Sequence, residues 1–473
     1  MMAGNYASIS MSATITKKSE YVVINPATGE VHARFDLHSD DQLERRLDRS
    51  ARAFADWRRT SFAERAGLFR KLADMLRDRQ DALAYKMAVE MGKPLAQGKA
   101  EAVKCGLVCD HYAKHAESML APYTVETELT QSEVVHRPLG SILAIMPWNF
   151  PLWQVFRAAA PNLMAGNTMV LKHAPNVPET ALEMEKMMLE VGFPSGVFLN
   201  VFVSNDQAEA VIASPVIKGV CLTGSGRAGR AVAATAGKNL KPVLLELGGS
   251  DPYIILEDAD LALAAEKTAF SRMLNNGQTC ISAKRFIVVE SVAEEFTQRV
   301  LAELDKYVIG DPLEDGVTQG PMARADLCAE LQKQVDRAVA AGAKIARGGQ
   351  QLDRPGYFFP TTLLTDVRPG MAAFTEEFFG PVGSVITAKS QDEAIALANQ
   401  SPFGLGSAIF TQDVELGLRL ARDEISAGTC VINDFVRSDP RLPFGGISES
   451  GFGRELGAEG IKEFVNIKTV CVG

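Results

Sequence analysis

The sequence predicts an α/β protein whose parallel sheets are covered by helices on both faces. From Gly140 onward, short apolar segments with the character of strands alternate with helical segments, a pattern typical of parallel sheets. A glycine-rich turn at 222–229 ends one such strand and begins a helix, as in dinucleotide-binding folds. The chain has 473 residues, more than one hydrophobic core usually organises, so two or three domains are expected.

The N-terminal part is predicted to be mainly helical. Residues 22–30 predict a strand that ends in a turn containing proline. Residues 40–91 are strongly helical, because apolar side chains recur three and four residues apart until Gly92 interrupts the pattern. A further helix is predicted over 95–119.

The middle of the chain begins with a predicted hairpin. Residues 124–135 alternate in character and contain β-branched side chains, and such an arm suits subunit pairing because an exposed edge invites another strand. The next predicted elements are strand 141–146, helix 154–164, strand 168–172, helix 178–191, strands 197–203 and 217–222, helix 228–236 and strand 242–246. A second alternating block runs from 258 to 433.

Composition excludes several classes of protein. The 47% hydrophobic and 23% charged content is ordinary for a soluble globular protein. A net charge of -9 argues against nucleic-acid binding and gives no support for docking on anionic lipid, and no apolar run reaches the length of a membrane span. Seven scattered cysteines do not form a disulfide framework, so a reducing cytoplasm is expected. Residues 1–20 lack a secretory signal and are interpreted as a loose arm, with Met11 as an alternative start.

Two cysteines and two histidines lie close together in the predicted helix 95–119, as in some zinc sites. They are Cys105, Cys109, His111 and His115. At about 100° per residue, the cysteine pair and the histidine pair point to different sides of one helix. We therefore expect a packed helix with two ordinary faces and no bound metal.

Cys280 lies at the end of a loop that leads into a predicted strand. The residues before it, 275–279, are small or polar, and residues 286–289 are apolar and mostly β-branched. Loops held by a rigid scaffold commonly carry reactive residues, but an isolated cysteine is more often a small buried hydrophobe. The role of Cys280 therefore depends on the motifs elsewhere in the chain.

The glycine-rich turn matches the pattern G-x-G-x-x-G with Gly224, Gly226 and Gly229. Backbone N–H groups at the start of the following helix, with no side chains in the way, would bind a pyrophosphate. Glu246 lies about 20 residues later, where this pattern expects an acid that binds the ribose. It also ends a strand before Leu247 and two glycines, an environment that could tune its pKa for work as a base. The spacing does not choose between these two roles.

The segment 147–151, Pro-Trp-Asn-Phe-Pro, follows a predicted strand. Its prolines fix the backbone, its aromatic rings form an apolar wall, and Asn149 supplies an amide. A side-chain amide beside a reactive cysteine is what an oxyanion hole needs. The alternative is an aromatic turn in the core.

Taken in series, these motifs resemble the successive signatures of the aldehyde dehydrogenase superfamily, from about Val22 to Val472. The motifs are Pro-Trp-Asn-Phe-Pro at 147–151, Leu-Thr-Gly-Ser at 222–225, Glu-Leu-Gly-Gly at 246–249, Asn-Gly-Gln-Thr-Cys at 276–280, Glu-Glu-Phe-Phe-Gly-Pro-Val at 376–382, Pro-Phe-Gly-Gly at 443–446 and Ser-Gly-Phe-Gly-Arg-Glu-Leu-Gly at 450–457. The resemblance implies an aldehyde dehydrogenase-like fold with a Rossmann-type cofactor domain, an α/β catalytic domain and an oligomerisation arm.

The resemblance also implies catalytic roles. Cys280 would be the nucleophile that attacks the aldehyde and forms a thiohemiacetal, and hydride transfer to a nicotinamide would leave a thioester. Glu246 would activate the water that releases the acid, which favours the base over the ribose ligand. Asn149 and the backbone N–H of Cys280 would form the oxyanion hole. Glu455 matches a family glutamate proposed to pass protons from the base.

For the cofactor, the resemblance implies that Ser225 contacts the pyrophosphate, Lys172 the adenosine ribose and Glu377 the nicotinamide ribose, while Phe379 packs near the nicotinamide ring. The other expected cofactor contacts are Trp148, Gly224, Gly229 and Leu247. Strictly NAD-dependent members often carry a glutamate three residues after the lysine, where this chain has Pro175. Without that carboxylate a 2′-phosphate is not repelled, so NADP is expected to be accepted, alone or alongside NAD.

Within the superfamily, the sequence is most similar to succinate-semialdehyde dehydrogenases, particularly a shorter bacterial type with Trp-Gln-Val-Phe-Arg after the 147–151 motif. Arg157 would then bind the distal carboxylate of the aldehyde, since the planar guanidinium suits a carboxylate. Trp153 would line the same site. Ser438, Arg437 or Arg441, in the loop before 443–446, would complete it, and Ser438 is preferred because a loop serine plays this part in relatives. Two positions depart from relatives: Leu274 replaces a second carboxylate-binding arginine, and Ala158 replaces a lysine.

The expected organisation has a cofactor-binding domain at 1–123 and 141–246, a catalytic domain at 247–433, an arm and tail at 124–140 and 448–473, and a substrate loop and linker at 434–447. The tail strand, 464–470, is expected to pair across the subunits of a homodimer or homotetramer. The expected function is NAD(P)-dependent oxidation of succinic semialdehyde to succinate. The alternatives are another aldehyde, such as glutaric semialdehyde or an aliphatic one, or a catalytically silent scaffold on this fold.

Overall fold

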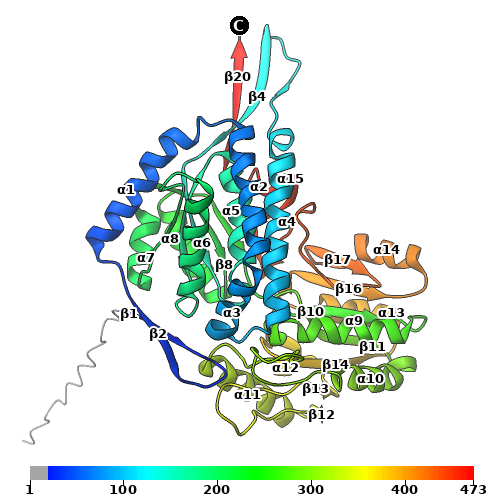
Figure 1. Cartoon of the computed structure of the whole chain (residues 1–473). Coiled ribbons are helices and arrows are strands. Elements are labelled where there is room, and N and C mark those ends of the chain that lie inside the picture. Colours follow the sequence, from blue (N-terminus) through cyan, green and yellow to red (C-terminus); the bar gives the residue numbers. More distant parts are fainter. Residues whose placement is uncertain (1–19) are drawn as a thin grey trace, which may run out of the picture.

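The computed structural model describes residues 20–473 and contains two α/β units and a projecting arm (Figure 1). The expected N-terminal arm, apart from Glu20, and the alternative start Met11 lie outside the described residues. A short hairpin comes first, from β1 (Glu20–Ile24) and β2 (Val31–Asp36). The turn predicted after the first strand is confirmed, because Asn25 and Glu30 close it with a backbone hydrogen bond of 2.8 Å.

The first unit is built on a six-stranded sheet with the order β19-β9-β8-β5-β6-β7. Its strands are β5 (Ser141–Met146), β6 (Thr168–His173), β7 (Phe198–Asn200), β8 (Ile217–Thr223), β9 (Val243–Glu246) and β19 (Gly451–Phe452). All neighbours are parallel except β19, which pairs antiparallel with β9. The prediction of a parallel sheet is therefore confirmed, although β7 is shorter than the predicted strand 197–203.

Helices cover both faces of this sheet. They are α1 (Asp40–Trp57), α2 (Phe62–Asp78), α3 (Gln80–Met91), α4 (Leu95–Met119), α5 (Trp153–Ala165), α6 (Pro178–Val191), α7 (Asn205–Ala213) and α8 (Gly226–Lys238). The predicted helical stretch 40–91 is divided into three, and one division falls where Ser61 and Glu64 form a capping box. Helix α7 was not predicted from the sequence.

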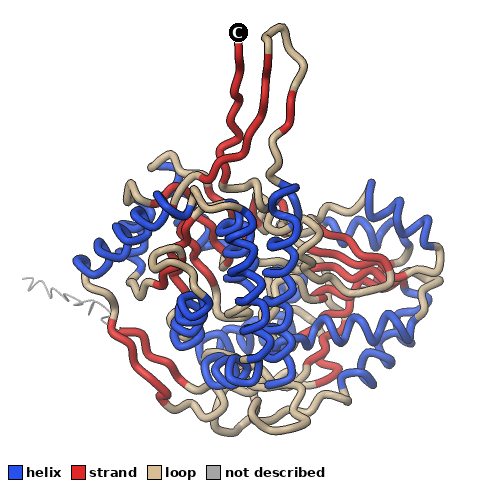
Figure 2. Tube along the Cα trace, turned by 45° about the horizontal axis from the view of Figure 1, so that its top comes forward, coloured by secondary structure: helices blue, strands red, loops and turns tan. Residues whose placement is uncertain are grey.

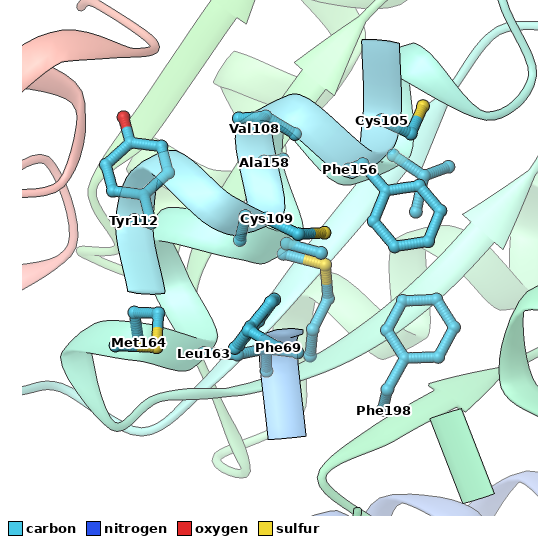
Figure 3. Packing of buried hydrophobic residues seen from close by; sticks show 14 of the residues in the cluster. Phe69, Cys105, Val108, Cys109, Tyr112, Phe156, Ala158, Leu163, Met164 and Phe198 are labelled. Atoms are coloured by element: carbon cyan, nitrogen blue, oxygen red, sulfur yellow. The ribbon is translucent and has the colours of Figure 1, made fainter. Parts of the chain in front are cut away.

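The largest buried cluster lies where α2, α4 and α5 pack together and against the sheet (Figure 3). Cys105 and Cys109 are fully buried in it, beside Phe69 and Phe156. Strand residues alternate between the two faces: Ile142, for example, belongs to this cluster, whereas Leu143 packs on the opposite face with α1 and α8.

The second unit is built on a seven-stranded sheet with the order β12-β13-β14-β11-β10-β16-β17. Its strands are β10 (Asp251–Ile255), β11 (Ala283–Val289), β12 (Lys344–Arg347), β13 (Thr362–Thr365), β14 (Val382–Ala388), β16 (Gly406–Phe410) and β17 (Thr429–Ile432). Its helices are α9 (Leu261–Met273), α10 (Glu290–Leu304), α11 (Ala325–Ala340), α12 (Ala372–Thr375), α13 (Gln391–Asn399) and α14 (Val414–Asp423). Only β12 runs antiparallel to its neighbour in this sheet.

Three strands form an arm that projects from the first unit (Figures 1 and 2). They are β3 (Tyr123–Thr124), β4 (Gln131–Pro138) and β20 (Val465–Val472). The tail strand β20 pairs along its whole length with β4 of its own chain, and its expected pairing across subunits stays a prediction. It does so as an edge strand, so its other edge is unpaired within residues 20–473.

Short elements complete the description. They are β15 (Phe403–Gly404), β18 (Ile447–Ser448) and α15 (Gly457–Gly460). Within the described part of the chain, none of the helices combines the length and apolar character needed to cross a membrane.

Candidate active site

Two cavities meet at Cys280. One, of about 240 Å³, extends from the glycine-rich turn at Gly224 past Trp148 and Glu377. The other, of about 320 Å³, extends to the loop around Ser438. Cys280 lines both. A thiol at this position can contact one molecule in each cavity, which is the arrangement that a reaction between two substrates needs.

The loop before Cys280 is held in an unusual backbone conformation. After α9, a turn of 3-10 helix (Leu274–Gly277) places Asn275 and Asn276 at φ 57°, in the left-handed region that asparagine tolerates better than most residues. Gly277 follows at φ 73°, and a Cβ there would lie 2.3 Å from the backbone of Gly380. Only glycine fits such a position.

Side chains of this loop bind backbone groups of distant segments. The Asn276 amide donates to the carbonyl oxygens of Gly92 (2.8 Å) and Pro321 (2.9 Å). The Gln278 side-chain oxygen accepts from the backbone of Ala323 at 3.0 Å. Lys284, at the start of β11, donates to the carbonyl of Cys280 at 2.6 Å. These bonds fix the position of Cys280 before any ligand binds.

Burial raises the pKa of the Cys280 thiol to about 12, although the nearby cations Arg157 and Lys284 act to lower it. The carboxylate of Glu246 adds to the rise. Burial therefore favours the neutral thiol, and the two cations favour the thiolate.

Glu246 ends β9 and is buried, with 1% of its surface exposed. Burial raises the pKa of its carboxyl to about 8, while Arg157 opposes the rise and Glu455 adds to it. A carboxyl with this pKa exchanges protons near neutral pH, as a general base must. Its buried Oε1 has no hydrogen-bond partner among the described residues.

Asn149 lies between the loop of Cys280 and the first cavity. Its Nδ2 donates to the backbone carbonyl of Gln278 at 3.1 Å, and its backbone carbonyl accepts from the side-chain amide of Asn275 at 2.6 Å. The amide is 3% exposed and lines the cavity together with Cys280. The sequence interpretation placed this amide beside the thiol, and both lie in the wall of the same cavity.

Arg157 and Glu455 form a buried ion pair behind the second cavity. Arg157 also donates to the Thr223 hydroxyl at 3.3 Å, and Cys221 donates its S–H to Glu455 at 3.3 Å. Burial raises the pKa of the Glu455 carboxyl, and Arg157 opposes that rise. Arg157 therefore lines the cavity with its charge already matched by a carboxylate.

The first cavity offers the features that a dinucleotide would need. Ser225 is the N-cap residue of α8, and its hydroxyl accepts from the backbone N–H of Ala228 at 3.3 Å. It is exposed at the N-terminus of the helix, where a pyrophosphate can bind. A Cβ at Gly229 would lie 2.7 Å from Leu247, so the glycine allows the helix to approach the strand end. Gly224 donates its backbone N–H to the backbone carbonyl of Glu246 at 2.9 Å.

Further along this cavity, Glu377 accepts from the backbone of Gly249 at 3.1 Å and pairs with Lys284 at 3.3 Å. Trp148 and Phe379 pack edge to face with ring centroids 5.8 Å apart. Lys172 lies at the end of β6, and burial lowers its pKa to about 8. Lys172 is not part of the wall of this cavity, and it has no ion-pair partner among residues 20–473, so its ammonium is available to a ligand that extends beyond the cavity.

In the second cavity, the indole Nε1 of Trp153 donates to the hydroxyl of Ser438 at 2.9 Å. Leu274 forms part of the apolar wall. Two residues that line the cavities were given no role from the sequence: Gln154, which lines both cavities, and Lys104, which lines the second. Lys284, which donates to the carbonyl of Cys280, was given none either. Gln154 lies in the Trp-Gln-Val-Phe-Arg segment but carries no titratable or nucleophilic group, and Lys104 and Lys284 lie outside the motifs, so only their position in the fold reveals them.

Comparison with known proteins agrees with this geometry. The family model described as "Aldehyde dehydrogenase family" matches residues 14–470. The chain is 49% identical over 449 residues, covering 95% of this chain and 99% of the relative, to a "Probable succinate-semialdehyde dehydrogenase" with the qualifier NADP(+) from Synechocystis. It is 44% identical, covering 97% and 99%, to a succinate semialdehyde dehydrogenase with the qualifier NAD(P)+ from Escherichia coli K12.

A solved structure is also closely similar. The crystal structure of succinic semialdehyde dehydrogenase from Streptococcus pyogenes in complex with NADP+ superimposes with a TM-score of 0.93. The two chains are 38% identical, and the match covers 96% of this chain and 99% of that one.

Proposed function

Because this chain belongs to the aldehyde dehydrogenase family, we propose that it oxidises succinic semialdehyde to succinate with NADP or NAD as the acceptor. The observation that carries the proposal is the position of Cys280 between two cavities. One cavity has the features of a dinucleotide site, and the other ends in polar and cationic side chains. Relatives that match along nearly the whole chain bear the name succinate-semialdehyde dehydrogenase, which supports the choice of substrate.

The proposed chemistry begins when the Cys280 thiol loses its proton to water in the site and the thiolate sulfur bonds to the aldehyde carbon, whose C=O bond opens to a C–O single bond. The oxygen of the aldehyde, which gains negative charge, is held by the Asn149 amide and the backbone N–H of Cys280. A bound nicotinamide would accept the hydrogen of that carbon with both electrons of the C–H bond, as a hydride, and the C=O bond would re-form to leave a thioester on Cys280. Glu246 then takes a proton from water, the water oxygen attacks the thioester carbon, the C–S bond breaks and succinate is released.

Glu246 is proposed as this base rather than as a ribose ligand. Its pKa of about 8 and its burial beneath the site support the role. Glu377 has the contacts expected of the ribose-binding carboxylate, since it lines the first cavity and accepts from the backbone of Gly249. Glu455 is proposed to exchange protons with the base, supported by its electrostatic effect on the pKa of Glu246.

The cofactor is proposed to lie in the first cavity, with its pyrophosphate at Ser225 and the start of α8 and its adenosine ribose at Lys172. Phe379 and Trp148 are proposed to pack near the nicotinamide, and Gly224, Gly229 and Leu247 to let the backbone approach it. Acceptance of NADP is supported by Pro175, which brings no carboxylate close to Lys172, and by the NADP+ complex of the Streptococcus pyogenes enzyme.

The distal carboxylate of the substrate is proposed to lie at the end of the second cavity, where Trp153, Ser438 and Arg157 line the wall. The hydrogen bond between Trp153 and Ser438 supports this placement, because it holds two polar side chains together at the end of the cavity. The remaining wall is largely apolar and suits the short methylene chain of the substrate.

A substrate panel tests this function. With NADP, kcat/KM for succinic semialdehyde should exceed that for butanal, which carries a methyl group in place of the carboxylate, by on the order of 10-fold or more. Initial rates can be followed by the absorbance of the reduced cofactor, with NAD in a parallel series. A higher kcat/KM for glutaric semialdehyde or for butanal would assign another aldehyde, and no turnover with any of them would indicate a silent scaffold. Rejection of NADP would refute the cofactor proposal.

We propose a homodimer or homotetramer in which the arm contributes to the subunit interface. The free edge of β20 and the exposed apolar side chains of the arm support this. They are Tyr123, Val125, Leu129, Ile467, Val470 and Val472. Light scattering should give two or four times the mass of one chain, and Ile467→Lys should shift the distribution towards smaller species. A monomeric wild-type protein would contradict the proposal.

We also propose the three-part organisation expected from the sequence, with the cofactor domain at 1–123 and 141–246, the catalytic domain at 247–433, the arm and tail at 124–140 and 448–473, and a substrate loop at 434–447. The two sheets support the first two parts, since β5 to β9 lie before residue 247 and β10 to β14, β16 and β17 lie after it, while β19 of the tail adds an edge strand to the first sheet. A cytoplasmic location is proposed from the cysteines, all seven of which are free.

A further inference from the structure

Lys104 lies at the end of the second cavity, beside two residues already proposed to bind the substrate. Its ammonium group donates to the hydroxyl of Ser438 at 3.1 Å and lies 4.0 Å from the centroid of the Trp153 ring. The three residues come from α4, α5 and the loop 434–447, and Lys104 and Ser438 are 334 residues apart in the chain.

The position of Lys104 relative to Trp153 is fixed by its own helix. Glu101, one turn earlier on α4, accepts hydrogen bonds at 2.9 Å from the backbone of Leu152 and of Trp153 at the start of α5. Its other carboxylate oxygen pairs with the buried Lys93. Glu101 thus joins the two helices, and its charge is already balanced by Lys93.

Among the cations around this cavity, Lys104 is the one whose charge is not matched by an ion pair within the described residues. Arg157 pairs with Glu455, and Arg437 pairs with Asp434. Asp439, the carboxylate next to Ser438, accepts from Nε and Nη2 of Arg441 at 2.8 and 2.7 Å. The end of the cavity therefore carries one positive charge that an anion would neutralise.

The hydrogen bonds at Ser438 also leave room for an anion. Its oxygen accepts from both Lys104 and Trp153, and the described residues give its hydroxyl hydrogen no acceptor. The Lys104 ammonium has three N–H groups, of which Ser438 takes one. A carboxylate placed here would accept from the ammonium and from the serine hydroxyl together, which are charge-assisted hydrogen bonds.

We propose that Lys104, together with the hydroxyl of Ser438, binds the distal carboxylate of the aldehyde substrate and so selects for acidic aldehydes. This inference rests on the proposed oxidation of succinic semialdehyde. Lys104 supplies the unmatched positive charge, whereas Arg157 contributes N–H groups whose charge Glu455 already balances. The Trp153 ring holds the ammonium in place without neutralising it.

Burial of Lys104 has an electrostatic cost that is consistent with this role. Burial lowers the pKa of its ammonium to about 8, and the positive charge of Arg157 lowers it further, while Glu101, Cys105 and Asp439 act in the opposite direction. A bound carboxylate would offset this cost, since an opposite charge at short range stabilises the charged form of a lysine.

The test compares Lys104→Met with Lys104→Arg, each assayed with succinic semialdehyde and with butanal at saturating NADP. For Lys104→Met, kcat/KM for succinic semialdehyde should fall by on the order of 10- to 100-fold, mainly through KM, while the loss with butanal stays below about threefold. Lys104→Arg keeps the charge and should recover most of the preference for the acidic substrate. The matched control is Lys99→Met, which removes a lysine of the same helix that pairs with Asp81 outside the cavity and should leave both substrates unaffected.

The outcomes separate this inference from the proposed function. A wild-type protein without preference for succinic semialdehyde over butanal would refute the proposed function, and this inference with it. A wild-type preference that Lys104→Met retains would refute the role of Lys104 alone. If Lys104→Met also loses butanal turnover, Lys104→Gln is tested in its place. The measurement is then the competitive inhibition of its butanal turnover by succinate. An inhibition constant unchanged from wild type would then overturn the proposal, and one raised 10-fold or more would support it.

Discussion

Replacing Cys280 by serine should lower kcat for aldehyde oxidation by on the order of 10³-fold or more. The sulfur lies where the two cavities meet, and no other described side chain that lines both cavities is a nucleophile, since the other shared residue is Gln154. A serine hydroxyl loses its proton far less readily than a thiol, and its oxygen is a weaker nucleophile towards the aldehyde. The measurement is the initial rate of cofactor reduction under saturating substrate.

Cys471→Ser is the matched control for this change. It removes a thiol that is exposed on β20, far from the cavities in the chain, and should keep the wild-type rate. Cofactor binding by Cys280→Ser, measured by titration, should stay close to that of the wild type, because the residues proposed to bind it are unchanged. A Cys280→Ser protein that keeps a tenth or more of the wild-type kcat would refute the nucleophilic role.

Replacing Glu246 by glutamine should separate the two halves of the reaction. The amide cannot take a proton from water, so the steady-state rate should fall by about 10²- to 10⁴-fold, the contribution typical of a general base. Formation of the thioester does not require this base, so the first turnover should still occur. Rapid mixing should show a burst of about one reduced cofactor per active site, followed by a slow phase.

The pH dependence provides a second measurement on the same residue. Because burial raises the pKa of Glu246 to about 8, its carboxyl is largely protonated at pH 7 and becomes the ionised base as pH rises through 8. The wild-type steady-state rate should therefore increase between about pH 7 and 9 where hydrolysis of the thioester limits it, and Glu246→Gln should lack this increase. The exposed Glu449, which pairs with Arg230, provides the control Glu449→Gln.

Other results with Glu246→Gln would assign a different role. A raised KM for the cofactor with a normal kcat would identify Glu246 as the ribose ligand that the glycine-rich pattern alone suggested. Loss of the burst together with the steady-state rate would place Glu246 in the first half of the reaction, as the base that deprotonates Cys280. Either result would contradict the activation of water.

Most secondary structure could be predicted because its determinants are local. Helix α4 and strand β5 have the predicted bounds, 95–119 and 141–146, since an apolar period and a glycine or proline at the end define each of them within a few residues. The division of 40–91 into three helices was missed, because its breaks contain neither proline nor glycine. Helix α7 is short and only two of its residues are buried, so it has little apolar pattern to detect.

The family and the main candidate residues also followed from the sequence, because the motifs around Cys280, Glu246 and Asn149 are contiguous in the chain. The pKa values of these residues did not follow from the sequence. The pKa of about 8 at Glu246 results from burial and from Arg157 and Glu455, which lie on other elements. A motif specifies which group is present, but the burial and neighbouring charges that set its pKa come from packing between distant segments.

The amino-acid sequence by itself therefore determined the α/β class, the family and the identity of the thiol and carboxyl expected to react. Only the tertiary structure decided how the charges of the second cavity are matched. It pairs Arg157 with Glu455 and places Lys104 beside Ser438. The physical reason is that hydrophobic period and turn chemistry act over a few residues, whereas an ion pair is set by distances of a few ångströms between side chains hundreds of positions apart.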